Sequence, residues 1–542
     1  MDNVGKFINV KILSIRFKKQ KIRSDSMFKN KKVLSLVIVT LILSLVLTAC
    51  GGNKEIARKN PADTLVVAQG ADAKTLDPHA SNDQPSSRVI KQIYNTLIFA
   101  NEDMELVPAL AESWTSIDEL TWEFKLAQGV KFHNGEEFKA SDVKFTFERM
   151  INSPSVAHII GPVSEVKVID DYTVQIITSE PFAPLLSHLT HTASSILNEK
   201  AVTDAGADYG QKPVGTGPFK FVDWQSGDKI ALERFDEYFQ GPAKVKNVVF
   251  RNITEGTNRT TGLETGEIDI AYDIEPIDKR IVTDNSSLEL IEGPSFSNEY
   301  LGFNTKKAPF DDIRVRQAIN YAVDVDEIIA TVLEGAGEPA KSPLTDLVFG
   351  ANNNIEGYKY DPEKAKELLK EAGYENGFQT TIWTNDKPER VRIAEIVQAK
   401  LKEVGIEAKI EQVEWGAYLD RTAAGEHDMY ILGWTAVTGD ADYGLYALYH
   451  SSQHGDAGNR FFYSNPEVDK LLDIGKTEVD QEKRLEAYKE AQELIVQDAP
   501  QLFLFFKNQN AGQHRAIKGF KLHPAGHHSL YNVTIEGATV EE

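Results

Sequence analysis

Apolar and polar residues alternate along several short stretches of the chain, and this period of two predicts strands. In TWEFKL the apolar positions are Trp122, Phe124 and Leu126, and in YTVQII they include Val174 and Ile176. Further strands are predicted at LVVAQG from Leu65, TTIWTN from Thr380, IEAKIEQVEW from Ile406, MYILGWT from Met429 and QLFLFF from Gln501. The glycine-rich stretch from Pro213 to Phe239 predicts a crossover into a hairpin, with Ser226-Gly227-Asp228 as its turn.

Helix signals dominate the second half. Asp361-Pro362-Glu363 supplies a capping residue, a proline at the first helical position and an acidic first turn, and Gly373 ends the apolar stripe that follows. Asn465-Pro466-Glu467 repeats this arrangement, Asp480 begins a longer helix that stops near Pro500, and Ser141-Asp142 opens a helix in the first half. Strands that alternate with helices predict an α/β fold.

The run from Val33 to Ala49 is uncharged, and Lys29, Lys31 and Lys32 precede it. A basic segment followed by an apolar one is typical of a secretory signal. Leu47-Thr48-Ala49-Cys50 resembles the processing box of bacterial lipoproteins, which implies a signal peptide over residues 1–49, a lipid anchor on Cys50 and a flexible linker over 50–61. The alternative is an uncleaved transmembrane helix at the short end of the spanning range. Translation starts at Met1 or at Met27.

Composition narrows the function classes. The formal net charge of −22 becomes −30 without residues 1–49, because that segment has ten basic and two acidic residues. An acidic protein lacks the cationic surface that nucleic acids require, so no nucleic-acid partner is expected. Cys50 is the one cysteine, so a disulfide framework is excluded.

Four ordered motifs resemble one family of transport receptors. They are Leu106 to Met150 (LVPALAESWTSIDELTWEFKLAQGVKFHNGEEFKASDVKFTFERM), Pro213 to Phe219 (PVGTGPF), Phe303 to Ala322 (FNTKKAPFDDIRVRQAINYA) and Tyr463 to Lys470 (YSNPEVDK). The family is the family 5 extracellular solute-binding proteins, which includes the oligopeptide and dipeptide receptors of ABC importers.

The resemblance implies a two-lobed fold of the periplasmic-binding-protein type (class II, the Venus flytrap), with an extra subdomain inserted in lobe one. Lobe I is then expected over residues 62–96, 205–300 and 507–542, the inserted subdomain over 97–204, and lobe II over 301–506. Phe303, Asn304 and Lys507 are the hinge candidates, because the chain is expected to cross between lobes near these residues.

Candidate ligand-binding residues cluster between Gly433 and Ser452. Trp434 and Thr435 end an apolar strand, and Asp440, Asp442 and Arg460 follow. In the resembled peptide receptors an acid three residues after this tryptophan pairs with the ligand ammonium, but Val437 occupies that position. Asp440 or Asp442 is the candidate replacement and Arg460 the candidate partner of a ligand carboxylate. The alternatives are helix caps for the acids, a solvated or lobe-bridging role for the arginine, and a core position for Trp434.

Other chemistries find little support. His450 with His454, and His523 with His527 and His528, have spacings that an ion can share, but surface histidines are the simpler interpretation, and neither a metal nor a cofactor is expected. Gly215-Thr216-Gly217-Pro218 lacks the ending of a phosphate loop, and the chain contains neither a GxSxG nor an HExxH motif. No enzymatic activity is expected.

Together these features predict a monomeric lipoprotein on the outer face of the cell membrane, in a bacterium without an enclosing outer membrane. Its expected partners are a peptide ligand, the membrane through the lipid anchor, and the permease of an ABC importer with its cytoplasmic ATPase. The alternatives are a receptor for glutathione, a nickel chelate or another small solute, and a surface adhesin or signalling receptor on the same scaffold.

Overall fold

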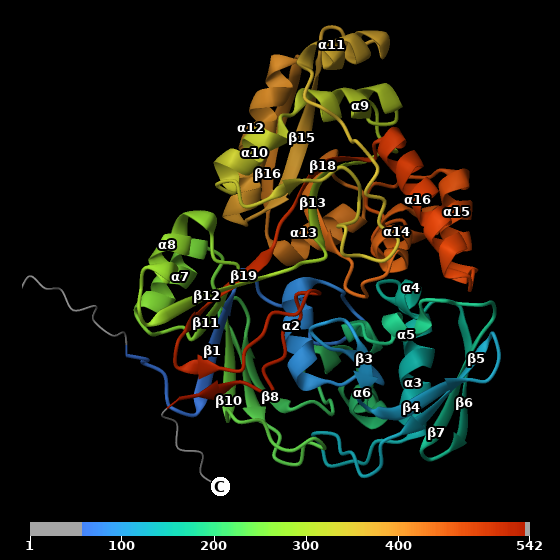
Figure 1. Ribbon diagram of the computed structural model, residues 1–542, viewed down its shortest axis with the longest axis vertical. Coiled ribbons are helices and arrows are strands. Elements are labelled where there is room, and N and C mark those ends of the chain that lie inside the picture. The colour runs from blue at the N-terminus through green and yellow to red at the C-terminus, as the bar shows by residue number, and fades with distance from the viewer. Residues whose placement is uncertain (1–56, 537–542) are drawn as a thin grey trace, which may run out of the picture. The chain divides into compact units, whose positions relative to one another are not determined.

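The computed structural model describes residues 57–536 (Figure 1). The expected leader and the anchor residue Cys50 lie outside the described residues. Within 57–536, no helix has the length and apolar character needed to cross a membrane.

A seven-stranded sheet collects strands from three separate parts of the chain. Its order is β12-β19-β11-β1-β10-β9-β8. The strands are β1 (Thr64–Gln69), β8 (Phe219–Gln225), β9 (Lys229–Arg234), β10 (Asn247–Asn252), β11 (Ile270–Tyr272), β12 (Leu288–Gly293) and β19 (Gln509–His514). Strand β1, the predicted LVVAQG segment, is buried and pairs in parallel with both β10 and β11. Strand β19 returns late in the chain and lies antiparallel between β11 and β12.

We call residues 57–96, 198–296 and 507–536 the seven-stranded lobe, after this sheet. Its other elements are α2 (Gln84–Ile93), α6 (Glu199–Ala205), η2 (Gly206–Gln211), α7 (Gly256–Glu264), η3 (Pro276–Asp278), α8 (Lys279–Thr283), β20 (Ile517–Lys518) and β21 (Thr534–Ile535).

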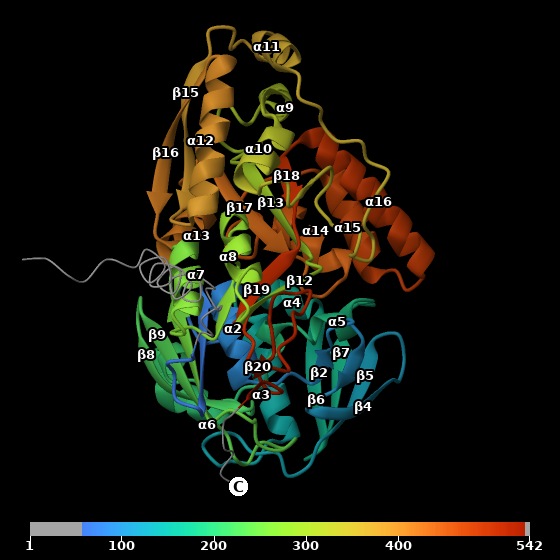
Figure 2. The same cartoon turned by 60° about the vertical axis from the view of Figure 1, so that its left-hand side comes forward.

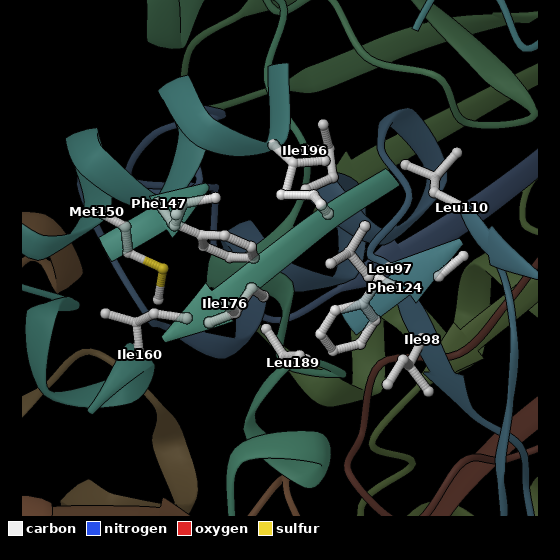
Figure 3. Close-up of a cluster of buried hydrophobic side chains, with 14 of the residues drawn as sticks. Leu97, Ile98, Leu110, Phe124, Phe147, Met150, Ile160, Ile176, Leu189 and Ile196 are labelled. Atoms are coloured by element: carbon white, nitrogen blue, oxygen red, sulfur yellow. The ribbon is translucent and has the colours of Figure 1, made fainter. Parts of the chain in front are cut away.

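Residues 97–197, here called the inserted segment, interrupt this lobe and have their own core. They contain β2 (Ile98–Ala100), β3 (Leu106–Pro108), β4 (Ala111–Ser116), β5 (Thr121–Leu126), α3 (Ala140–Ile151), α4 (Ala157–Ile160), β6 (Val163–Asp170), β7 (Thr173–Thr178), α5 (Leu185–His188) and η1 (Thr192–Ser194). The four-stranded sheet runs in the order β4-β5-β7-β6. Phe124, Ile176 and Leu189 converge in the core on one side of this sheet, as the alternation in TWEFKL and YTVQII predicts (Figure 3).

Residues 297–506 form a second lobe around a six-stranded sheet, and we call them the six-stranded lobe. Its order is β14-β18-β13-β17-β15-β16. The strands are β13 (Ser297–Phe303), β14 (Glu338–Pro339), β15 (Phe378–Asn385), β16 (Ile406–Val413), β17 (Met429–Thr435) and β18 (Gln501–Phe506). The helices are α9 (Ile313–Ala322), α10 (Val325–Val332), α11 (Pro362–Glu371), α12 (Pro388–Glu403), α13 (Trp415–Ala423), α14 (Ala441–Tyr449), η4 (Ser451–Gln453), α15 (Pro466–Thr477) and α16 (Gln481–Asp498). Helix α12 runs alongside β15 and β16 (Figure 2).

The predicted helix starts are confirmed where a capping side chain is present. Asp361, Asn465 and Asp480 each accept a backbone hydrogen bond from the first turn of α11, α15 and α16. Helix α3 begins at Ala140, one residue before the predicted Ser141, and Asp142 accepts a hydrogen bond from the Lys139 backbone at 2.9 Å. The fold is α/β, as predicted.

The chain passes between the two large sheets at two places. Strand β12 ends at Gly293 and β13 begins at Ser297, so the first crossing lies at residues 294–296. Strand β18 ends at Phe506 and β19 begins at Gln509, so Lys507 and Asn508 form the second.

Candidate ligand-binding site

The exit of strand β17 places Trp434 and Thr435 at one edge of the six-stranded lobe. Asn298 of β13 accepts a hydrogen bond from the Trp434 backbone at 3.0 Å, and the Thr435 hydroxyl lies 2.7 Å from that of Ser297. These contacts with the antiparallel neighbour fix the end of the strand. The indole Nε1 of Trp434 is buried and has no hydrogen-bond partner among the described residues.

Asp440 is held within its own lobe. Its carboxylate caps α14 by accepting a hydrogen bond from the Asp442 backbone at 2.9 Å. Both of its oxygens also lie 3.0 Å from Nη2 of Arg484. Burial raises the pKa of Asp440, and the Arg484 charge opposes that rise. The structure thus gives Asp440 two partners within the six-stranded lobe.

Asp442, the second residue of α14, faces the inserted segment. It is 2% exposed, and its Oδ2 lies 3.2 Å from Nε2 of His188. Its Oδ1 is buried without a hydrogen-bond partner among residues 57–536. Asp442 therefore brings a carboxylate with a free acceptor atom to the contact between the six-stranded lobe and the inserted segment.

Tyr443 inserts its ring among three histidines of the inserted segment. The centroid distances are 6.1 Å to His158, 6.1 Å to His188 and 4.9 Å to His191. The Tyr443 hydroxyl lies 3.1 Å from Nε2 of His191. On its other side, the ring centroid is 5.2 Å from that of Trp434.

Val437, at the position where the resembled peptide receptors carry an acid, is apolar and buried. Together with Tyr443 it packs into the core of the inserted segment. Sequence reasoning missed the three histidines that Tyr443 contacts, because their spacing along the chain matches no motif and only the fold brings them to α14.

Arg460 is buried with little compensation for its charge. The residue is 5% exposed, and its ion pair with Asp456 spans 4.0 Å. Its Nε has no hydrogen-bond partner in the described part of the chain. Asp456 in turn accepts a hydrogen bond from Ser155 of the inserted segment. A guanidinium in this setting has strong remaining capacity for an anionic group, because a buried, poorly paired charge is costly.

Three further polar contacts join the lobes. Trp415 donates from Nε1 to Asp83 at 3.1 Å. Lys74 pairs with Asp420 at 2.7 Å, and Arg392 pairs with Glu275 at 2.6 Å. Each contact joins the seven-stranded lobe to the six-stranded lobe, so the two lobes are in contact.

Of the three predicted hinge residues, two lie within the six-stranded lobe and one lies at a crossing between the lobes. Phe303 ends β13 and stacks on Phe310 at 5.7 Å, and Asn304 donates to backbone oxygens of Gly425 and His427, so both lie within the six-stranded lobe. Lys507 lies at the second crossing and contacts both oxygens of Glu389, at 2.7 and 2.6 Å. Burial alone would lower the pKa of Lys507, but the Glu389 charge outweighs burial and the pKa is raised.

The interpretation of the histidines considered for metal binding as surface residues is wrong for His450, His527 and His528, which are 9%, 7% and 2% exposed. His454 contacts the Tyr463 carbonyl oxygen at 2.9 Å, and His450 stacks on Tyr446 at 4.3 Å. Burial lowers the pKa of His527 and of His528 well below the usual range. In the described part of the chain, no three histidine, cysteine, aspartate or glutamate side chains are grouped so that they could hold a metal ion.

The glycines of the PVGTGPF turn are explained by packing. A Cβ on Gly215 would lie 2.1 Å from the Ile93 carbonyl oxygen, and one on Gly217 would lie 2.5 Å from the Ile93 carbonyl carbon. These positions require glycine because the turn lies directly against the end of α2.

The structure has two α/β lobes that are joined by two chain crossings. Buried, incompletely paired charges lie at the contact between the lobes, and this arrangement defines a two-lobed binding protein. Residues 105–456 match the family described as bacterial extracellular solute-binding proteins, family 5. The chain belongs to this family, whose members bind solutes and are not enzymes.

Similar proteins are found among characterised sequences and solved structures. The chain is 34% identical over 475 residues to the glutathione-binding protein GsiB of Pectobacterium atrosepticum, covering 85% of this chain and 92% of that protein. It is 34% identical over 476 residues to the dipeptide-binding protein of Escherichia coli, covering 82% and 89%. The structure of DppA from Helicobacter pylori in complex with the peptide STSA is similar with a TM-score of 0.83 and 34% identity, covering 87% of this chain and 98% of that one. The fold is therefore that of the type II periplasmic binding proteins.

Proposed function

We propose that this protein is an extracytoplasmic receptor that captures short peptides between its two lobes and delivers them to the permease of an ABC importer. The observation that carries the proposal is the pair of buried, incompletely satisfied charges at the lobe contact, Asp442 and Arg460.

A short peptide offers the complementary chemistry. Its ammonium group pairs with the free Oδ1 of Asp442, and its carboxylate pairs with the Arg460 guanidinium. The unpartnered Nε1 of Trp434 donates to a peptide carbonyl. Asp442, Arg460 and Trp434 all belong to the six-stranded lobe, and Asp442 lies against the inserted segment. A ligand held by these groups stabilises the closed arrangement through the contacts that it also makes with the facing inserted segment.

The relatives support this ligand class. The names of the two relatives state that they bind glutathione, itself a tripeptide, and dipeptides. The Helicobacter pylori structure holds a tetrapeptide and is described as ABC transporter-associated. We therefore include glutathione among the short peptides to be tested.

Closure needs a hinge, and we propose residues 294–296 together with Lys507 and Asn508. These short connections join the two large sheets, and a few residues at such connections absorb the dihedral changes of lobe closure. Phe303 and Asn304 then move with the six-stranded lobe.

A thermal-shift screen tests the ligand class. The protein is heated with a dipeptide and tripeptide pool, with glutathione, and with nickel plus free histidine. A peptide at one hundred times its dissociation constant raises the free energy of unfolding by about 2.7 kcal/mol. Absence of any response to the peptides and to glutathione contradicts the proposal, and a response to nickel plus histidine alone favours a chelate receptor.

Paired changes in protein and ligand test the two charges. N-acetylation of a binding peptide weakens its affinity for the wild type but has little further effect on Asp442→Asn, because the charge pair is already lost. Amidation of the carboxyl end behaves in the same way with Arg460→Gln. Glu467→Gln, which changes an exposed ion pair with Lys470, is the matched control and leaves the affinity unchanged. If each peptide modification weakens binding to its variant as much as it weakens binding to the wild type, the two losses are additive. Additive losses for both pairs contradict the assignment of Asp442 to the ammonium and of Arg460 to the carboxylate.

We further propose that Cys50 carries the lipid anchor and that the organism has no enclosing outer membrane. An exported receptor then needs a tether to remain near its importer, and two acyl chains on one cysteine suffice. Cys50→Ala releases a ligand-competent receptor into the medium, measured by immunoblot of medium and membrane fractions. Retention of that variant at the membrane favours an uncleaved helix.

A further inference from the structure

His188, at the end of α5, has one ring nitrogen whose protonation state follows from its neighbour. Its Nδ1 lies 2.7 Å from the carbonyl oxygen of Ile159. A carbonyl oxygen accepts hydrogen bonds and cannot donate them, so Nδ1 carries a hydrogen. In a neutral imidazole the other nitrogen, Nε2, then presents a lone pair.

That second nitrogen faces a carboxylate. Nε2 of His188 lies 3.2 Å from Oδ2 of Asp442, and the two side chains are 1% and 3% exposed. A carboxylate oxygen also presents lone pairs, so a neutral imidazole and an ionised carboxylate in this arrangement repel each other in a buried environment. One additional proton on the imidazole removes the repulsion and leaves the carboxylate charge available to a ligand ammonium.

We propose that His188 is a positioning residue for Asp442 and that closure of the lobes on ligand takes up one proton into this pair. The inference rests on the proposed function, because Asp442 is the group that meets the ligand ammonium. The proton holds Oδ2 against the inserted segment and leaves Oδ1 directed to the ligand. Capture of ligand is thereby linked to the pH outside the cell.

The neighbouring histidines require no additional proton. Nδ1 of His191 accepts a hydrogen bond from the Ala193 backbone at 2.9 Å, so its Nε2 carries the hydrogen and donates to the Tyr443 hydroxyl. His191 is thus satisfied as a neutral ring. Burial and the nearby His188 lower the pKa of His158 to about 3, so this ring is also neutral.

The two cations near the pair, Lys476 and Arg484, have other neighbours. Lys476 of α15 lies over the rings of Phe182 and Tyr446, at 5.9 and 4.4 Å from their centroids, and its charge also lowers the pKa of His158. In the six-stranded lobe, Arg484 is engaged by Asp440.

The tyrosines near Asp442 stay neutral. Burial raises the pKa of Tyr446 to about 12 and that of Tyr443 above it, and burial also raises the pKa of Tyr488 well above the usual range. These tyrosines therefore contribute no charge near neutral pH.

The direction of the pH effect follows from proton counting. A solvent-exposed imidazole loses its proton around pH 6.5, and an exposed carboxylate holds none at that pH. Because the proposed closure takes up one proton, the dissociation constant rises with pH, by up to about tenfold per pH unit.

Calorimetry in two buffers measures the proton directly. Binding of a dipeptide or glutathione is titrated at pH 7.5 in phosphate and in Tris, whose ionisation enthalpies differ, and the difference in binding enthalpy gives the protons taken up. The wild type takes up close to one. His188→Gln, whose amide donates to Asp442 without an ionisable proton, binds with none. His191→Gln, the matched control, keeps the uptake.

Absence of proton uptake in a wild type that binds ligand overturns the inference, as does uptake that persists in His188→Gln. A second measurement needs no ligand and so separates this inference from the proposed function. Small-angle X-ray scattering of the free protein shows a smaller radius of gyration at pH 6 than at pH 8 for the wild type and no change for His188→Gln. The same radius at both pH values for the wild type overturns the inference even where no peptide binds.

Discussion

The carboxylate of Glu299 in β13 is buried, and Arg390 at the start of α12 holds it. The two residues are 6% and 8% exposed, and Arg390 contacts both carboxylate oxygens. Burial opposes the charge on Arg390, but the Glu299 charge outweighs burial and the pKa of the arginine is raised. Removing one member of such a pair leaves an uncompensated charge in the interior, which costs far more than the pair contributes.

Arg390→Met is therefore expected to lower the free energy of unfolding by about 3–5 kcal/mol. Urea denaturation followed by tryptophan fluorescence measures the loss. Lys470→Met breaks an exposed pair with Glu467 and is the matched control, with an expected loss of about 0–1 kcal/mol. Equal losses in the two variants contradict the prediction.

Helix starts in this chain follow side-chain caps that are visible in the sequence. Asp480 accepts hydrogen bonds from the Glu482 and Lys483 backbones at 2.9 and 3.3 Å, and α16 follows for about five turns. The helix ends at Asp498, and the capping residue Ala499 adopts a left-handed conformation with φ of 48° directly before Pro500. Local chemistry thus sets both ends of this element.

Asp480→Ala removes the cap and is expected to lower the free energy of unfolding by about 1 kcal/mol. Asp480→Asn keeps an acceptor oxygen at the same position and retains most of the stability. Thermal melts of the two variants, compared with the wild type at one pH, separate these outcomes. A loss of similar size in both variants would show that charge, and not the hydrogen bonds, is what matters.

At the scale of the whole molecule, buried histidines link stability to pH. Burial lowers the pKa of five of them to about 3 or 4, and these are His79, His133, His158, His427 and His523. In the unfolded chain each binds a proton as the pH falls through about 6.5, whereas in the folded protein each stays neutral. The unfolded state therefore binds more protons below pH 6.5, and stability falls as the pH falls.

The melting temperature is accordingly expected to fall between pH 6.5 and 4.5, with each buried histidine contributing up to about 1.4 kcal/mol per pH unit. In the upper part of this window ordinary carboxylates stay ionised in both states, so histidines dominate the effect there. Asp142, whose pKa is raised to about 6 by burial, opposes them because the folded state takes up its proton. Scanning calorimetry at pH 6.5, 5.5 and 4.5 measures it, and His79→Gln is expected to reduce the slope. A melting temperature that is constant over this range contradicts the prediction.

Much of the fold could be predicted from the sequence because its signals are local. Period-two alternation predicted β5 and β7, short strand-like runs between helices predicted β15, β17 and β18, and the capping residues predicted the starts of α11, α15 and α16. The crossing between lobes was harder to predict. A strand such as β13 looks the same whether the chain changes sheet before it or after it, and the structure has the first crossing at residues 294–296.

The candidate site could also be predicted only in part, because some of its features are local in the sequence and others depend on contacts between distant elements. Trp434, Thr435, Asp440 and Asp442 became candidates because they lie in a segment that is rich in glycine, tryptophan and acids, and Arg460 because it follows a glycine-rich loop. The sequence could not tell Asp440 from Asp442, because the partner of Asp440 is Arg484 and the partner of Asp442 is His188, and both partners come from distant elements.

The sequence by itself determined the class of fold, the positions of most elements and the family, because periodicity, capping and ordered motifs are properties of neighbouring residues. Only the tertiary structure decided which charges are compensated, since that depends on contacts between segments far apart in the chain. Tyr443 among three histidines and Asp442 against His188 exist because α14 packs on the inserted segment. No local pattern encodes that packing, and the proposed proton-linked closure depends on it.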